Sequence, residues 1–526
     1  MKVLVCDSLS EVGIKIFQET PGVDVDVNTG LTPDELINVI AQYHGLVIRS
    51  ATKVTGRILE AAENLKVIGR AGIGLDNVDI PAATQRGIVA MNTPGGNTIT
   101  AAEHAMAMIM ALTRNIPQAT ASLKSGKWEK KKLQGRELFN KTLGLIGAGN
   151  IGRIVADRAK GMKMKVIVYD PFIKPETLER LDLEPVSFDE LLMRSDYITI
   201  HTPKTDETLN LINRDSIAKM KKGAMVINCA RGGIVNEEDL YEALSSGHLA
   251  GTALDVFSEE PPGDISLMSL PNFICTPHLG ASTREAQDNV AKDVAEQIIA
   301  YLLHGTVKNA VNVPSVSTEL MSVLRPYASL AEKMGSFQTQ LTDSGILEVQ
   351  IDYSGKVTEY DVTPLTSGML KGLLTPILKD EVNFINASVI AAERGIKVVE
   401  SKTKTSEDFA SLIELRVKTL DDVNIVSGTI FGKTMPRILR INDFYLEAIP
   451  EGHNLLIYNE DVPGVIGRIT TCLGAQEINI GRMAVGQEKA KKQNVILLHT
   501  NISVGDAVLD ELRRIDHILS VKRIGL

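Results

Sequence analysis

The stretch that decides the fold is Thr142-Leu-Gly-Leu-Ile-Gly147-Ala-Gly149-Asn150-Ile151-Gly152. The residues before Gly147 predict a buried strand, and those after Gly149 predict a helix that runs to Lys160. In such a turn Gly147 permits the sharp bend, Gly149 lets the backbone approach a pyrophosphate, and Gly152 lets helix and strand pack closely. The stretch therefore predicts a dinucleotide-binding fold, with the pyrophosphate at the N-terminus of the helix.

An acidic residue ends the next predicted strand. The run Lys165–Tyr169 is strand-like, and Asp170 follows it, about twenty residues after the glycine-rich turn. A carboxylate in this position accepts hydrogen bonds from ribose hydroxyls and repels a 2′-phosphate. No arginine follows Asp170 closely, so the sequence favours NAD over NADP as the cofactor.

Short apolar runs alternate with amphipathic runs up to about residue 310. Strands that are apolar throughout and alternate with helices predict doubly wound parallel sheets covered on both faces. A long helical candidate, Thr98–Arg114, separates two such α/β units. The further predicted strands are Lys2–Cys6, Gly45–Arg49, Lys66–Arg70, Ile88–Met91, Tyr197–His201, Ala224–Cys229, Thr252–Val256 and Phe273–Thr276.

The pattern changes after Pro314. Residues 315–450 have less regular strands and predict a separate α+β domain that includes a helix at Leu324–Met334. Residues 453–526 have the order strand, helix, strand, strand, helix, strand. This order predicts a ferredoxin-like module.

The bulk composition limits the possible partners. The 526 residues carry a net charge of −9, which disfavours broad attraction to nucleic acid or to an anionic membrane. No run approaches the roughly eighteen apolar residues of a spanning helix, and the start MKVLVCDSLS lacks a signal-peptide pattern. The four cysteines are scattered, without metal-ligand spacing. We therefore expect a soluble cytoplasmic protein with no metal, no nucleic-acid partner and no membrane partner.

Three polar side chains, Arg231, Glu260 and His278, follow predicted strands at the edge where open α/β sheets bind ligands. Oxidising an alcohol by hydride transfer leaves a proton, which a histidine can accept. A carboxylate bonded to the imidazole fixes its tautomer. An arginine can grip the carboxylate of an α-hydroxy acid with two parallel bonds and polarise its C2 oxygen. Together the three residues predict dehydrogenation of a 2-hydroxy acid.

Each of these residues also has an ordinary structural explanation. Taken singly, His278 is more often a structural histidine, Arg231 an ion-pair residue and Glu260 a loop carboxylate. Their occurrence together at the strand ends of a dinucleotide fold favours the catalytic interpretation. Asp255 is ambiguous, because it could lie near the nicotinamide ring or simply terminate its strand.

The motifs around these residues resemble one family. Asn228-Cys-Ala-Arg231-Gly-Gly233, Leu254-Asp-Val-Phe-Ser-Glu-Glu260-Pro and Pro277-His278-Leu-Gly-Ala-Ser-Thr283 are similar to motifs of the D-2-hydroxyacid dehydrogenase family. Within that family, Gly69-Arg70-Ala71-Gly72 and Met91-Asn92-Thr93-Pro94 look like the long-form members that act on 3-phospho-D-glycerate. The resemblance covers essentially the whole chain.

The resemblance implies a role for each matching position. Arg231 orients the substrate, Glu260 supports the base, and His278 transfers the proton. The implied NAD contacts are Gly147, Gly149, Asn150, Ile151, Gly152, Asp170, Thr202, Cys229, Ala230, Arg231, Asp255, His278, Gly280 and Ala281. The implied substrate side consists of Arg49, Arg70, Ala71, Gly72 and Asn92.

The resemblance also implies the domain division. A split substrate-binding domain, 1–97 plus 288–312, encloses an inserted Rossmann NAD-binding domain, 98–287. An intervening domain, resembling an allosteric substrate-binding domain, follows at 313–450, and an ACT regulatory domain occupies 453–526. Trp128 and Lys130–Lys132 fit a loop that adds positive charge near a substrate phosphate, although a solvated charge run explains them equally well. A homodimer or homotetramer is implied by the family.

The ACT resemblance implies an effector. L-Serine could bind at the N-terminus of the first ACT helix at a subunit interface, with Asp461 accepting from its amine and Asn479 bonding its other polar groups. Asn459 departs from the pattern, because some serine-sensitive relatives have a larger polar residue there.

The implied activity is NAD-dependent oxidation of 3-phospho-D-glycerate to 3-phosphohydroxypyruvate, the first step of phosphorylated L-serine biosynthesis. One alternative is a sibling dehydrogenase that acts on hydroxypyruvate, glyoxylate or D-lactate, or a 2-oxoglutarate reductase. The long C-terminal extension argues against the unphosphorylated siblings. An alternative of another class is an NADH-sensing regulator, which would need partner-binding segments or a basic DNA-binding helix pair that the chain does not offer.

Overall fold

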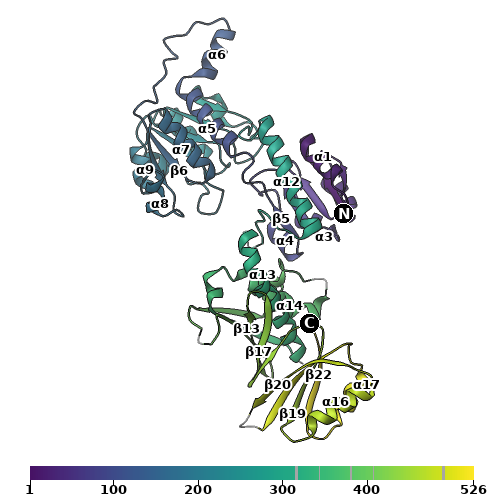
Figure 1. The fold of residues 1–526 in the computed structure, drawn as a ribbon. Helices are drawn as coiled ribbons and strands as arrows, with labels where there is room; N and C mark the ends of the chain where they lie inside the picture. The colour runs from purple at the N-terminus through teal and green to yellow at the C-terminus, as the bar shows by residue number, and fades with distance from the viewer. Residues whose placement is uncertain (314–317, 343, 380–381, 407, 489–491) are drawn as a thin grey trace.

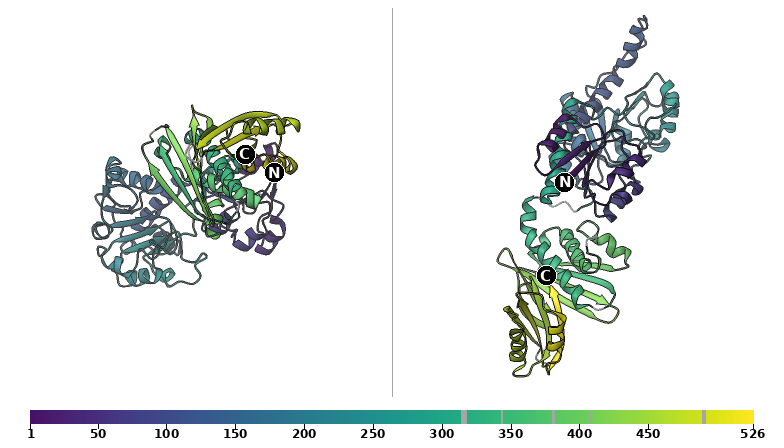
Figure 2. Two further views of the ribbon diagram at one scale, coloured as in Figure 1. Left: turned by 90° about the horizontal axis from the view of Figure 1, so that it is seen from below. Right: turned by 90° about the vertical axis from the view of Figure 1, so that its right-hand side faces the viewer.

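Four sheets with their helices follow one another along an elongated chain (Figures 1 and 2). This computed structural model describes residues 1–313, 318–342, 344–379, 382–406, 408–488 and 492–526. Among these residues, no helix combines the length and the apolar character needed to cross a membrane.

The first sheet is five-stranded and parallel, in the order β2-β1-β3-β4-β5. Its strands are β1 (Lys2–Val5), β2 (Asp24–Val27), β3 (Gly45–Ile48), β4 (Val67–Arg70) and β5 (Val89–Met91). Its helices are α1 (Glu11–Glu19), α2 (Pro33–Ile40), α3 (Gly56–Ala61), α4 (Ile80–Gln85) and the returning α12 (Arg284–His304). The apolar sides of α1 and α12 pack on one face and those of α2 and α3 on the other. The pattern did not predict β2, because this edge strand is largely exposed and alternates aspartate with valine.

The second sheet is seven-stranded and parallel, in the order β12-β11-β10-β9-β6-β7-β8. Its strands are β6 (Thr142–Ile146), β7 (Lys165–Tyr169), β8 (Glu184–Pro185), β9 (Tyr197–Ile200), β10 (Met225–Asn228), β11 (Gly251–Leu254) and β12 (Phe273–Cys275). One face carries α5 (Thr98–Thr113), α7 (Asn150–Gly161) and α8 (Pro175–Arg180). The other carries α9 (Phe188–Arg194), α10 (Arg214–Ala218) and α11 (Glu237–Ser245). The prediction of two doubly wound parallel units is confirmed.

The strand order places a switch point at β6. From β6 the chain continues to β7 on one side, and later places β9 on the other. Ligands of open α/β sheets bind outside the carboxyl ends of the strands at such a point. The glycine-rich turn follows β6, so topology and sequence motif mark the same edge.

The third sheet has six strands in the order β14-β13-β15-β16-β17-β18. It mixes one parallel pair, β13 with β14, with antiparallel pairs. The strands are β13 (Ile346–Gly355), β14 (Lys397–Thr403), β15 (Ser411–Thr419), β16 (Val423–Phe431), β17 (Met435–Ile441) and β18 (Phe444–Ala448). The helices are α13 (Thr318–Leu341), α14 (Thr363–Leu378) and α15 (Ala387–Glu393), and α13 and α14 pack together over the sheet. The predicted α+β class is confirmed, and α13 extends well beyond the predicted Leu324–Met334.

The last sheet is antiparallel, in the order β20-β21-β19-β22. Its elements are β19 (His453–Glu460), α16 (Val465–Ala475), β20 (Ile480–Glu488), β21 (Gln493–Thr500), α17 (Asp506–Arg513) and β22 (Ile518–Gly525). Both helices cover one face, where Ile469 and Leu512 are buried against the strands. The predicted ferredoxin-like order is confirmed.

Candidate active site

The glycine-rich turn is held by close backbone packing. Gly147 has φ +92°, and a Cβ there would lie 2.7 Å from the carbonyl oxygen of His201. A Cβ on Gly152 would lie 2.1 Å from the carbonyl oxygen of Gly147. A Cβ on Gly149 would meet no atom within 4 Å, so the space beside Gly149 is open. Two of the three glycines are thus required by the fold, and the third borders free space at the start of α7.

Asp170 is fixed beside this turn. Its Oδ2 accepts a hydrogen bond from the backbone N–H of Ala148 at 2.9 Å, and its Oδ1 accepts one from Phe172 at 2.9 Å. Each carboxylate oxygen has two acceptor sites, so both oxygens can still accept from a ligand. The arrangement suits ribose hydroxyls next to a pyrophosphate.

Thr202 supplies an independent test of that fit. It follows β9, and its methyl group lies where a Cβ on Gly147 would point, at 2.8 Å. Its hydroxyl oxygen is buried and has no hydrogen-bond partner among the described residues. A buried, unpaired hydroxyl is costly, so a bound polar group such as a phosphate oxygen would stabilise it. The residues at this turn therefore fit the dinucleotide that the sequence predicts.

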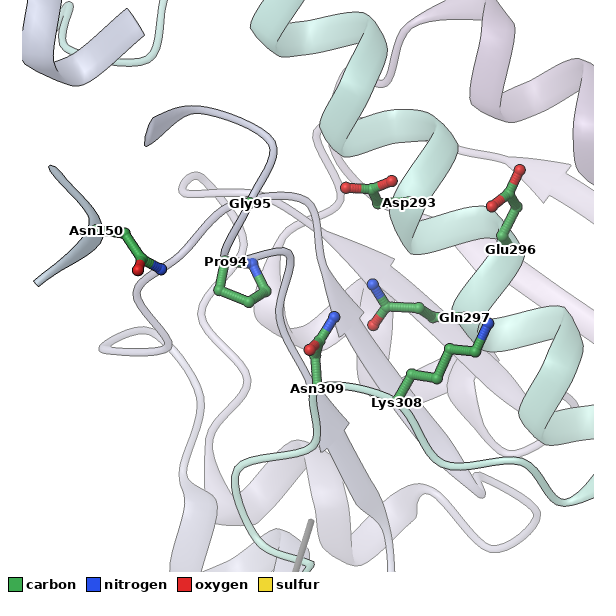
Figure 3. A pocket seen from close by; sticks show the side chains of 8 residues that line it. All are labelled: Pro94, Gly95, Asn150, Asp293, Glu296, Gln297, Lys308 and Asn309. Atoms are coloured by element: carbon green, nitrogen blue, oxygen red, sulfur yellow. The ribbon is translucent and has the colours of Figure 1, made fainter. Parts of the chain in front are cut away.

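A cavity of about 440 Å³ joins this turn to the first sheet and its helices (Figure 3). Asn150 at the start of α7 faces it from one side. Pro94 and Gly95 border it from the segment that leads into α5. The remaining lining residues are Asp293, Glu296, Gln297, Lys308 and Asn309. A cleft between two α/β units, bordered by the segments that connect them, can change its width as a hinge moves.

His278 and Glu260 form a hydrogen-bonded pair. The distance from His278 Nδ1 to Glu260 Oε2 is 2.8 Å, and Oε1 of Glu260 accepts from the backbone N–H of Phe257 at 3.2 Å. The two residues follow the neighbouring parallel strands β12 and β11, which explains why residues 18 positions apart meet. Because the carboxylate engages Nδ1, the other ring nitrogen, Nε2, is left for a ligand. The side chains are 45% and 38% exposed, so a small molecule can reach the pair.

Asp255 holds the loop that carries His278. Its carboxylate is fully buried and accepts hydrogen bonds from the backbone N–H groups of Leu279 at 2.7 Å and Gly280 at 2.8 Å. Burial by itself raises its pKa, but hydrogen bonds from His104, Thr276 and Leu279 outweigh burial and hold the pKa below its usual value. Because both carboxylate oxygens are enclosed, the geometry favours the alternative in which Asp255 terminates its strand over the one in which it lies near the nicotinamide ring.

Arg231 connects the two α/β units. Its Nε donates to Oδ2 of Asp76 at 3.1 Å, across 155 positions of sequence. A Cβ on Gly74 would lie 2.1 Å from Arg231 Nη2, so the guanidinium occupies the room that Gly74 leaves. Asn228 fixes the backbone beneath it, donating to the Arg231 carbonyl at 2.9 Å and accepting from Ala230 at 3.0 Å.

Three arginines share this region of the cleft. Burial, and then the charge of Arg231, lower the pKa of Arg70 to about 10, and Arg49 adds to this effect while Asp76 opposes it. Arg70 also lies against the strand of Arg49, because its Nε donates to the Arg49 carbonyl at 3.2 Å. A concentration of positive charge in a cleft attracts a small molecule with several negative charges.

Other predicted residues serve as scaffolding here. Asn92 donates its side-chain N–H to the Ile73 carbonyl at 2.6 Å, and the backbone N–H groups of Ala71 and Gly72 bond to Ile48 and Arg70. Burial and the charge of Asp255 raise the pKa of the Cys229 thiol, which keeps it uncharged. Ile151, beside Asn150, packs on the core of the second sheet, and Ala281 follows Gly280 in the His278 loop.

Asn97 is a residue that the sequence interpretation missed. It precedes α5 and its Oδ1 is buried without a hydrogen-bond partner in the described part of the chain. Its position at the start of a predicted helix was a visible signal, but that position ordinarily indicates a cap, and Asn97 makes no side-chain cap here. The free oxygen makes Asn97 a further candidate to contact a ligand in the cleft.

The predicted effector residues lie at two ends of the last sheet. Asp461 follows β19, where it accepts from Gln487 and, at 3.0 Å, from Asn494. Asn479 precedes β20 and is exposed beside Asn501, at the opposite end of the eight-residue strand β21. Eight residues of strand span about 25 Å. One chain therefore does not bring the two residues together, and a site that uses both needs two copies.

Asn459 lies beside Asp461 at the same end of the sheet. It is buried and pairs across the sheet with Asn494. The side-chain oxygens of both asparagines are buried without a partner among the described residues. With Asp461 they form a group of acceptors near the N-terminus of α16.

The segment of Trp128 lies away from the cleft of its own chain. Helix α6 (Ile116–Lys124) projects from the second sheet, with no buried residue of its own (Figures 1 and 2). Trp128 is 82% exposed, and Lys132 pairs with Glu129 at 2.9 Å. Within one chain, this charge run therefore lies outside the arginine group.

Comparisons with known proteins agree with this architecture. Residues 106–280 match the profile of the D-isomer specific 2-hydroxyacid dehydrogenase, NAD binding domain. Residues 323–442 match the D-3-phosphoglycerate dehydrogenase intervening domain, and residues 453–517 match the ACT domain. NAD is therefore the cofactor, as the acidic residue after β7 predicts.

Similar proteins span the whole chain. The D-3-phosphoglycerate dehydrogenase of Archaeoglobus fulgidus is 44% identical over 529 residues, covering 100% of both chains. That of Bacillus subtilis is 40% identical over 526 residues, covering 100% of this chain and 99% of the relative. Among solved structures, the NAD-dependent formate dehydrogenase of Staphylococcus aureus in complex with NAD aligns with 31% identity and a TM-score of 0.54, covering 60% of this chain and 100% of that one. The chain belongs to the D-3-phosphoglycerate dehydrogenase family of NAD-dependent oxidoreductases, with an intervening domain and an ACT domain.

Proposed function

We propose that the chain oxidises 3-phospho-D-glycerate at C2 to 3-phosphohydroxypyruvate, the first step of phosphorylated L-serine biosynthesis. The observation that carries the proposal is the His278–Glu260 pair at 2.8 Å, at the carboxyl ends of β11 and β12 beside β10, after which Arg231 follows. Full-length similarity to D-3-phosphoglycerate dehydrogenases, including the intervening domain, favours this activity over that of the shorter siblings.

His278 is the proposed base. Its Nε2 accepts the proton of the C2 hydroxyl, while Glu260 holds the proton on Nδ1 and stabilises the imidazolium that forms. NAD⁺, held by the turn at Gly147–Gly152 and by Asp170, would supply the acceptor for the hydride of C2. Asp255 acts as a positioning residue, since it fixes the backbone at Leu279 and Gly280 next to the base.

The arginines are the proposed anchors of the substrate. Arg231 grips the C1 carboxylate and polarises the C2 oxygen, and this contact strengthens as the oxygen gains charge in the transition state. Arg49 and Arg70 supply the positive charge that matches the phosphate. Closing the cleft would exclude water and strengthen these contacts.

The direct test is NADH formation from 3-phospho-D-glycerate, with a hydrazine trap for the keto product. D-Glycerate and D-2-hydroxyglutarate are the matched alternatives, because one lacks the phosphate and the other carries a carboxylate in its place. Turnover of D-glycerate with a kcat/KM equal to that of the phosphorylated acid would contradict the proposal. Activity with D-2-hydroxyglutarate would add a 2-oxoglutarate reductase side activity without removing the main one.

We also propose L-serine as an inhibitor at the ACT domain. The buried acceptor oxygens of Asn459 and Asn494, next to Asp461, suit an ammonium group, and the N-terminus of α16 suits a carboxylate. Asn479 would come from a second copy. Millimolar serine should slow turnover and raise the melting temperature, and Asp461→Ala should remove both effects. No change in either quantity would eliminate this part of the proposal.

A homodimer or homotetramer is the proposed assembly. The projecting α6 and the exposed Trp128, Ile116 and Leu123 support a dimer contact, since several exposed apolar side chains on one projecting segment are typical of an interaction surface. In the dimer, Lys130–Lys132 of one copy could add charge to the cleft of the other. Molar mass by light scattering, with and without serine, tests this arrangement.

The proposed domain division is 1–97 with 288–312, 98–287, 313–450 and 453–526. The packing of α12 on α1 and β4 supports its assignment to the first unit, although this helix already begins at Arg284. We place the enzyme in the cytoplasm, where thiols stay reduced, because all four cysteines are free. Limited proteolysis and cell fractionation test these two points.

A further inference from the structure

A second cavity lies in the intervening domain, far from the dinucleotide turn along the chain. Its volume is about 280 Å³, and it opens between α14, α15 and β14. This is room for a molecule of about amino-acid size. The lining residues are Thr363, Thr366, Ser367, Leu370, Ser388, Ala392, Ile396, Val398 and Glu400.

One carboxylate is held at this cavity by a buried relay. The hydroxyl of Tyr353, a fully buried residue, lies 2.9 Å from Oγ1 of Thr366. The Thr366 hydroxyl donates to Oε1 of Glu400. Glu400 itself is an exposed residue of β14. Tyr353 thus fixes Thr366, and Thr366 fixes the orientation of the Glu400 side chain.

The remaining lining is made of hydroxyl and apolar groups. Ser367 is only 6% exposed, and it lines the cavity beside Thr366. Leu370, Ile396 and Val398 form apolar walls around it. A serine hydroxyl in the cavity wall, next to an oriented carboxylate, provides two hydrogen-bonding groups for a polar ligand.

The charges select the class of ligand. Among the described residues, Glu400 is the single charged one that lines the cavity, and no described lysine, arginine or histidine lines it. A phosphate or carboxylate would be repelled and would find no cation, so neither the substrate nor the cofactor fits here. We propose that this cavity binds a small primary-ammonium compound, with its ammonium on Glu400, a hydrogen bond to Ser367 and its carbon chain against Leu370 and Ile396.

The site adjoins the contact with the substrate-binding side of the enzyme. Ser388 and Ala392 of the cavity belong to α15, which begins after two asparagines that bond to the first α/β unit. Asn383 donates to the Gly87 carbonyl at 2.9 Å, and Asn386 donates to the Gln85 carbonyl at 3.3 Å.

Gly87 lies two residues before β5, the strand that leads to Asn92 and the cleft. An occupant that shifts α15 would therefore also shift the approach to the cleft. The geometry thus couples the ammonium site to substrate affinity.

Three probes of equal chain length test the charge selection: n-butylammonium, n-butanol and n-butyrate. Binding to the full chain is measured by saturation-transfer NMR and calorimetry, with a Kd for n-butylammonium on the order of 1 mM for so small a ligand. We expect n-butylammonium to bind at least roughly tenfold more tightly than the other two, as a charged hydrogen bond requires. Equal binding of n-butylammonium and n-butanol would overturn the proposal.

Variants locate the site. Glu400→Gln keeps an acceptor for Thr366 but removes the charge, and should lower n-butylammonium affinity roughly tenfold or more. Ala392→Phe, at an exposed lining position, should block binding by filling the cavity. The matched control is Glu348→Gln on β13, whose carboxylate pairs with Lys397 at 3.4 Å and does not line the cavity. Loss of binding in the control, or retention in both cavity variants, would place the ligand elsewhere.

The coupling between the ammonium site and substrate affinity is measured separately, and only this coupling rests on the proposed function. Saturating n-butylammonium should change the KM for 3-phospho-D-glycerate in the wild type and in Glu348→Gln, but not in Glu400→Gln. Binding without any change in KM would remove the coupling and leave the site. Failure of the enzyme to oxidise the substrate at all would leave the NMR result unaffected, so the two proposals fail separately.

Discussion

Replacing Gly149 by alanine tests where the cofactor lies against the protein. Gly149 has φ −67°, which any residue adopts, and a Cβ there meets nothing within 4 Å. The substitution should therefore leave the folded state intact. The added methyl group enters the open space at the N-terminus of α7, where the pyrophosphate is expected to contact backbone N–H groups.

The magnitude follows from the hydrogen bonds that the methyl group separates. Each hydrogen bond to a charged group contributes about 1.5–3 kcal/mol. Losing one such bond raises the Kd for NADH roughly 10- to 150-fold. The melting temperature without cofactor should stay close to that of the wild type.

Two other glycines of the same segment provide the comparison. Gly161→Ala, at the end of α7, also meets nothing within 4 Å and should change neither the Kd nor the melting temperature. Gly152→Ala drives a Cβ to 2.1 Å from the Gly147 carbonyl and should lower both cofactor affinity and stability. Calorimetric titration with NADH and thermal melts measure all three. A wild-type Kd in Gly149→Ala would refute the placement of the pyrophosphate at this turn.

Three further predictions concern the residues around the base and the substrate. His278→Ala should reduce kcat by about 10²–10⁴-fold, while calorimetry should still detect NADH binding. Retained turnover in this variant would contradict the assignment of His278 as the base. Arg231→Ala should raise KM and also lower kcat, with kcat/KM falling on the order of 100-fold, since the contact strengthens in the transition state; an effect on KM alone would indicate uniform binding. Asp255→Asn should lower the melting temperature at neutral pH, because hydrogen bonds hold the pKa of this carboxyl below its usual value in the folded chain. A carboxyl whose pKa is lower in the folded than in the unfolded chain stabilises the fold above its unfolded pKa, and this contribution is lost as pH falls through the folded pKa. The melting temperatures of wild type and Asp255→Asn should therefore converge only in acid, and convergence already at neutral pH would contradict the account of this residue.

Most of the fold could be predicted from local patterns. Continuous apolar runs predicted the parallel strands because both faces of those sheets are covered, and the order of the last six elements predicted a ferredoxin-like module. The edge strand β2 was not predicted, because its exposed aspartates interrupt the apolar run that marks the other strands. The length of α13 was also missed, because proline is ordinarily tolerated only in the first turn of a helix, and Pro326 therefore fitted a start at Leu324 rather than at Thr318.

The cofactor turn and the proposed reacting groups could be predicted from the order of residues alone. Gly147, Gly152 and Asp170 act through contacts within one βαβ unit, and His278 and Glu260 follow adjacent strands, whose carboxyl ends share an edge in any parallel sheet. Contacts of this kind join residues of one βαβ unit or of neighbouring strands, so sequence patterns can predict them.

How groups far apart in the sequence combine became visible only in the folded chain. It joins Arg231 to Asp76 across 155 positions, turns Asp255 inward as a buried anchor, and separates Asp461 from Asn479 at opposite ends of one sheet. It also forms the cavity at Glu400 from two helices and a strand. These relations depend on how whole elements pack against one another, and no spacing along the chain encodes that packing.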